Sequence, residues 1–164
     1  MATVGTLTTQ VTETIKLSNG NIVQSINNNS ISGINQVVRR VDTISTSFSG
    51  SGVEILNFVD SESEQTAGSF VKGTVKYIRI TNLDSTNFVT LYLIDTDTEG
   101  VMFKLDAGKT FMVSDAQFDA TSTSDVVVPG YIDIAYFSNL TSYDTIKAKA
   151  DTSNVAIEYF VASS

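Results

Sequence analysis

A short acidic segment, IDTDTEG, is the part of the sequence whose residue types and spacing best suit a chemical site. Its spacing is that of the first half of a calcium-binding loop, and the twelfth position of such a loop is also acidic here. Calcium takes several hard oxygen ligands, and a glycine at the sixth position makes the sharp turn that gathers them. The candidate residues are Asp95, Asp97, Glu99, Gly100 and Asp106.

The residues around this segment favour a hairpin turn instead. Apolar and polar residues alternate over 91–94 and again over 101–105, which predicts strands where a loop of this type would have helices. A strand over 101–105 alone spans about 17 Å, at ~3.3 Å per residue, which separates Asp106 from Glu99. Glutamate at the fifth position and aspartate at the twelfth also depart from the usual pattern. We therefore expect an acidic turn with no cofactor, and keep calcium as the alternative.

The sequence lacks the residues that the other common catalytic sites require. The chain has no histidine and no cysteine, which excludes a Ser–His–Asp triad, a cysteine nucleophile and the common zinc sites. Neither GxGxxG nor GxxxxGK[ST] occurs. A glycosidase needs only two carboxylates, but no pair stands out, since the acidic residues concentrate in predicted turns. We expect a protein that is not an enzyme and has no catalytic residues.

The charge of the chain limits its partners. The net charge is −8, which repels phosphate backbones, so we expect no nucleic-acid partner. No apolar run has membrane-spanning length, and no basic cluster suggests anionic lipid, so we expect no membrane partner. The N-terminus lacks the features of a secretory signal, which predicts synthesis and folding in a cytoplasm.

The dominant hydrophobic period is two, which predicts one domain over 1–164 built as an antiparallel β-sandwich or jelly-roll-like fold. Residues 22–36 are interpreted as a short strand or loop, and 142–151 as a short helical turn or loop. DAGK, at 106–109, is interpreted as a hairpin turn between its neighbouring strands. Residues 1–36 could form either an extended arm that packs on a neighbouring subunit or an ordinary edge hairpin. The predicted strands cover 7–17, 37–45, 53–59, 74–83, 88–94, 101–105, 110–113, 131–137 and 155–161; the predicted turns and loops cover 18–21, 47–52, 60–69, 84–87 and 114–125.

Four stretches resemble a type of small virion structural protein from tailed phages of aquatic bacteria. They are VKYIRITNLDSTNFVTLYLI, VMFKLDAGKTFMV, the terminal EYFVASS and, more weakly, TETIKLSNGN near the N-terminus. The similarity covers most of the chain and is stronger from residue 70 to 113. It contains no catalytic motif, so it transfers no site residue.

This resemblance implies a component of a phage particle. Size and acidity favour a capsid decoration or cement protein that sits on the capsid surface, binds the major capsid protein and forms homotrimers on local three-fold axes. A strand-forming arm could extend a neighbour's sheet. The alternative is a tail or fibre component, either an adaptor or a receptor-binding β-domain, with 60–69 and 114–125 as its exposed loops.

Overall fold

The alternation in the sequence appears as eleven β-strands in the part of the chain that the structure describes. The computed structural model describes residues 4–46, 52–94, 100–114 and 143–164. Two single-turn 3-10 helices, η1 (Glu62–Glu64) and η2 (Lys72–Thr74), lie on either side of β5. The predicted all-β class is confirmed. The strands are β1 (Gly5–Lys16), β2 (Ile22–Ile34), β3 (Gln36–Ile44), β4 (Val53–Val59), β5 (Ser69–Val71), β6 (Val75–Asn82), β7 (Val89–Ile94), β8 (Gly100–Leu105), β9 (Thr110–Val113), β10 (Thr145–Ala150) and β11 (Val155–Ser163).

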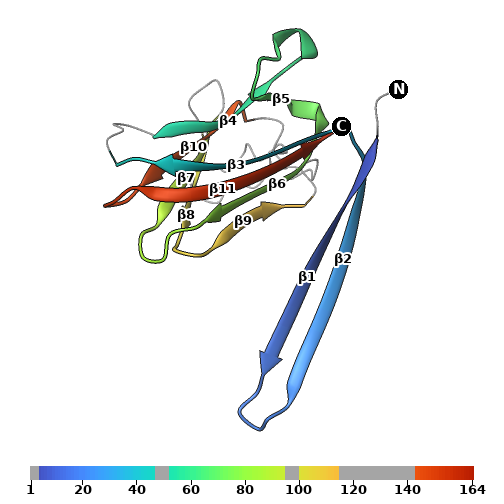
Figure 1. Cartoon of the computed structure of the whole chain (residues 1–164), viewed down its shortest axis with the longest axis vertical. Coiled ribbons are helices and arrows are strands. Elements are labelled where there is room, and N and C mark those ends of the chain that lie inside the picture. Colours follow the sequence, from blue (N-terminus) through green and yellow to red (C-terminus); the bar gives the residue numbers. More distant parts are fainter. Residues whose placement is uncertain (1–3, 47–51, 95–99, 115–142) are drawn as a thin grey trace, which may run out of the picture.

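Two of the sheets pack together as a sandwich (Figure 1). One has the order β5-β4-β10-β7-β8 and the other β3-β11-β6-β9. Described neighbours are antiparallel, apart from the short parallel pair of β4 and β5. Consecutive strands repeatedly cross from one sheet to the other: β3 to β4, β5 to β6, β6 to β7, β8 to β9 and β10 to β11. The inward side chains of both sheets make one core, in which Ile78, Ile157, Leu91 and Ile146 are completely buried.

A buried asparagine joins the crossing turns at one end of the sandwich. Asn82 is 1% exposed, and its Nδ2 donates hydrogen bonds to the carbonyl oxygens of Asn87 at 2.9 Å and Leu105 at 3.0 Å. Its Oδ1 accepts a 2.9 Å hydrogen bond from the backbone N–H of Asp84. The turns after β6 and β8 are therefore held together by one side chain whose polar groups all have partners.

β1 and β2 form a sheet of their own, a long hairpin that leaves the sandwich (Figure 1). Their register runs from Gly5 opposite Ile34 to Lys16 opposite Ile22. The predicted turn at 18–21 closes the hairpin, with Gly20 at φ +86°, a conformation that glycine adopts without strain. The hairpin is therefore extended and forms a sheet of its own, rather than the edge of one of the two sandwich sheets. The expectation of a short strand or loop over 22–36 was wrong, because β2 is thirteen residues long and pairs with β1 at every residue except Gly33, where the register shifts.

Two further predictions need correction. Residues 142–151 contain β10, a strand between β4 and β7, rather than a helical turn or loop. Lys147 and Lys149 alternate there with buried alanines, and pairing on both sides outweighs the helix propensity of alanine and lysine. DAGK joins β8 to β9 in opposite sheets, so it is not a hairpin turn. The predicted strand at 131–137, the loop at 115–125 and most of the turn at 47–52 lie outside the described residues.

Candidate interaction surface

The calcium candidates are only partly within the described residues. Asp95, Asp97 and Glu99 lie outside them. Gly100 pairs with Ile94 at the start of β8, and Asp106 follows the other end of that strand, about 20 Å away at ~3.3 Å per residue. Asp106 there pairs with Lys104 at 2.8 Å.

Strand pairing explains the glycine of this segment without an ion. A Cβ at Gly100 would lie 2.3 Å from the carbonyl oxygen of Leu93, which is closer than a side chain tolerates. Within residues 4–46, 52–94, 100–114 and 143–164, no three His, Cys, Asp or Glu side chains are grouped to hold a metal ion.

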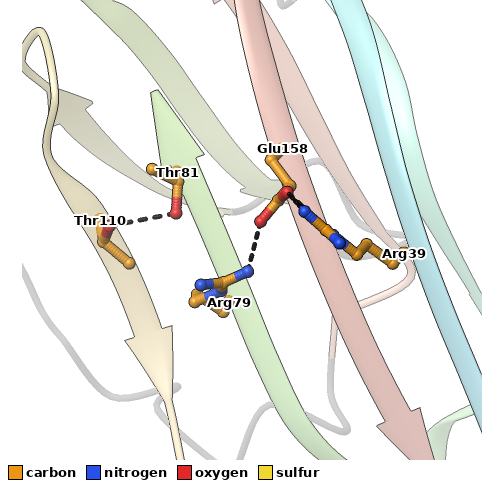
Figure 2. A network of polar contacts seen from close by, with 5 residues as sticks. All are labelled: Arg39, Arg79, Thr81, Thr110 and Glu158. Atoms are coloured by element: carbon orange, nitrogen blue, oxygen red, sulfur yellow. Dashed lines mark hydrogen bonds and ion pairs between the residues drawn. The ribbon is translucent and has the colours of Figure 1, made fainter. Parts of the chain in front are cut away.

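A network of three charged residues lies on the outer face of the four-stranded sheet (Figure 2). Glu158, on β11, accepts hydrogen bonds from Nε of Arg39 at 2.9 Å and from Nη2 of the same residue at 2.6 Å. Arg79 binds the other carboxylate oxygen. The sheet register creates this arrangement, because both arginines pair with Phe160, two residues along the same face from Glu158.

The electrostatics of this network favour an ionised carboxylate. The hydrogen bond from Arg39 lowers the pKa of Glu158, burial opposes that effect, and the charges of Arg39 and Arg79 add to the lowering. A carboxylate held in this way is a poor general base at neutral pH. The network carries one excess positive charge in a chain of net charge −8, and the Arg39 side chain is 68% exposed. It is therefore suited to binding an anionic group.

Apolar side chains surround this network on the same face. Val37 and Val41 flank Arg39 on the edge strand β3 and are more than half exposed. Met112 pairs with Arg79 from β9 and is also exposed. We call the surface formed by Val37, Arg39, Val41, Arg79, Met112, Glu158 and Phe160 the sheet face. Its mixture of apolar and charged groups is typical of a protein-binding surface.

The hairpin carries the second exposed apolar surface. Residues that pair directly across its two strands share a face. We call the face formed by Leu7, Val11, Glu13, Ile15, Val23 and Ile31 the arm face.

The two ends of the arm face have different surroundings. At the base, Leu7 and Ile31 pack against a cluster of Ile34, Tyr77 and Ala162, so the hairpin is anchored to the sandwich. Towards the tip, Ile15 and Val23 lie opposite each other and are 59% and 55% exposed. The apolar surface that anchors the hairpin therefore continues outward without a cover in the isolated chain.

A lysine with two carboxylates lies near the edge of the five-stranded sheet. Nζ of Lys72 is 2.7 Å from Asp60 and 2.5 Å from Asp144. Burial lowers the pKa of Lys72, but its hydrogen bonds to the two carboxylates outweigh that effect and raise it. The lysine thus stays charged and links the residues after β4 to those before β10, which is a structural role.

The candidate calcium residues belong to neither the sheet face nor the arm face. Sequence reasoning missed the sheet face because its members are far apart in the chain: Glu158 is separated from Arg39 by 119 residues and from Arg79 by 79. The alternation in 7–17 was the only signal for the arm face.

The chain was compared with known proteins in three ways. A scan against protein-family models, a search of curated proteins and a search of solved structures each gave no match. None of the helices in the described segments is long and apolar enough to cross a membrane.

Proposed function

We propose that this protein is a non-enzymatic structural subunit of a phage particle, a capsid decoration or cement protein that binds and stabilises the assembled shell. The observation that carries the proposal is the anchored hairpin with an uncovered apolar face. A two-stranded hairpin is marginally stable by itself in water, and large apolar groups exposed side by side mark a binding surface. The arm is therefore built to be covered by a neighbour.

Binding suits the described residues better than catalysis does. The central carboxylate of the sheet face is neutralised by two arginines, and Lys72 is neutralised by two carboxylates. Such paired groups fix structure and recognise partners, since their charges are already compensated.

The resemblance to small virion proteins supplies the partner and the place. The proposed partner is the major capsid protein, and the proposed location is the capsid surface, with homotrimers at local three-fold axes. Linked subunits bind a repeating lattice through several contacts at once, so modest individual contacts give firm attachment. The acidic surface keeps decorated particles apart in solution.

A tail or fibre component is the second candidate. The arm projects from one end of a β-sandwich (Figure 1), and the same shape could join adjacent subunits along a fibre or dock a receptor-binding domain onto a tail. The two candidates differ in the particle part that the protein binds.

Co-sedimentation with purified phage heads and purified tails tests the proposal. The test variant is Ile15→Ser/Val23→Ser, which makes the arm face polar. The matched control is Ile22→Ser/Ile26→Ser, which removes two isoleucines that are 65% and 55% exposed on the opposite face of the hairpin. We expect wild type and control to sediment with heads and the test variant to remain in solution. Sedimentation with tails alone would favour the second candidate, and failure to bind either part would contradict a role in the particle.

A further inference from the structure

We propose that the arm face of one copy binds the sheet face of a second copy of this chain, with Glu13 placed against Arg39 and Arg79. This inference rests on the proposed role as an assembly subunit and deepens it by naming the partner of the arm. It depends on four properties of the described residues: the charges of the two faces, the length of the arm, the residues on which the base of the arm packs, and the area of the contact.

Charge complementarity favours this pairing. The arm face carries one carboxylate, Glu13, between Val11 and Ile15, and the sheet face carries one excess positive charge among apolar side chains. Glu13 and Lys16 are the only charged side chains in residues 1–36, so all of the net charge of −8 lies outside the arm. A neutral arm can approach a second acidic copy without the repulsion that its other surfaces would meet.

The length of the arm prevents Glu13 from contacting the sheet face of its own chain. Glu13 lies six residues beyond Leu7, the last apolar β1 residue packed on the sandwich, and six residues of strand span about 20 Å. In Figure 1 the hairpin runs away from the sandwich over that length. Its carboxylate can therefore meet Arg39 and Arg79 only in another molecule.

The anchor of the arm shows that its apolar face fits this sheet. Leu7 and Ile31 pack on the cluster that contains Tyr77 and Ala162, and both of these residues lie on the same outer face as the arginines. The proposed contact repeats that packing further along the sheet, with Ile15 and Val23 against the exposed side chain of Val41, two residues from Arg39 on the same face.

The area is adequate for a reciprocal pair. The free part of the hairpin, 9–16 paired with 22–29, is about 27 Å long and about 10 Å wide, from ~3.4 Å per residue and ~4.8 Å per strand. A copy that gives one arm and receives another, in a pair or in a ring of three, takes part in two such contacts, which bury about 1,100 Å² in total, counting both surfaces of each. That area reaches the roughly 1,000 Å² expected of a specific interface.

Sedimentation velocity of the full chain over a range of concentrations tests the proposal. We expect a wild-type mass of two or three copies, a monomer for Ile15→Ser/Val23→Ser, and the wild-type mass for the opposite-face control Ile22→Ser/Ile26→Ser. A monomeric wild type at all concentrations would overturn the proposal.

A double-mutant cycle separates this contact from pairing of two arms with each other. Glu13→Gln and Arg39→Gln should each weaken association by about 3–10-fold, and the double variant should be no weaker than either single variant. Effects that multiply, or an Arg39→Gln variant that associates like wild type, would overturn the assignment of the sheet face. A wild-type chain that is monomeric but still sediments with heads would contradict this inference alone. A wild-type chain that forms oligomers but does not sediment with heads or tails would contradict only the proposed role in the particle.

Discussion

Replacement of Asn82 by alanine should destabilise the sandwich strongly, although the residue belongs to neither of the two proposed binding surfaces. The change removes three hydrogen bonds, two donated by Nδ2 and one accepted by Oδ1. Each is worth about 0.5–1.5 kcal/mol, and the carbonyl of Leu105 is left buried without this donor. We therefore expect the free energy of unfolding to fall by about 2–4 kcal/mol.

For a chain of this size, that loss corresponds to a fall in melting temperature of about 5–15 °C. The assay is thermal and urea unfolding followed by circular dichroism. Asn154→Ala is the control, because Asn154 is an exposed asparagine in the turn between β10 and β11 and should change stability by no more than about 0.5 kcal/mol. If Asn82→Ala unfolds within about 1 kcal/mol of wild type, the assignment of this side chain as the joint between the turns is wrong.

Three further predictions concern titration and ions. Burial and a hydrogen bond to Asp42 raise the pKa of Tyr159 to about 12. Because the phenol titrates at about 10 in the unfolded chain, wild type loses stability as the pH rises from about 10 to 12. Tyr159→Phe should lower the free energy of unfolding by about 1 kcal/mol in urea at pH 7, and the difference from wild type should shrink above pH 10. A difference that stays constant with pH would contradict the hydrogen bond to Asp42. The lowered pKa of Glu158 acts in the opposite sense, because stability gained from its ionised form is lost as the pH falls through the folded-state pKa. Glu158→Gln should therefore lower stability by about 1–2 kcal/mol at pH 6, and its thermal melts should converge with those of wild type as the pH falls below the folded-state pKa of Glu158. A difference that stays constant as the pH falls would argue against the ion pairs. Millimolar calcium should leave the melting temperature unchanged, and a rise of several degrees that Asp95→Ala abolishes would support the calcium loop instead.

Local pattern predicted the strands that have one face in the core. In β6 and β7, buried residues such as Ile78 and Ile80 or Leu91 and Leu93 recur at the period of two that the sequence displays. β2 lacked that signal because its central residues are asparagines and serines exposed to solvent, and its order comes from pairing with β1. β10 was missed because its alanines and lysines also suit a helix.

Sheet membership and the sheet face could not be predicted from the sequence. A period of two indicates which residues share a face, but it does not say which strands are neighbours. DAGK has the composition of a hairpin turn, yet it crosses between sheets, because β8 pairs with β7 and β9 pairs with β6. Arg39 and Arg79 meet Glu158 only through the register of β11 with its two neighbours.

As proposed, this protein belongs to a phage particle and lies on the surface of the capsid. Gold-labelled antibodies against the chain, applied to intact particles and viewed by electron microscopy, test it most directly. We expect gold distributed over the capsid surface, with tails unlabelled. Particles that carry no gold, while a control antibody against the major capsid protein labels them, would contradict the claim; gold confined to the tail or its tip would replace the capsid role with the tail or fibre alternative.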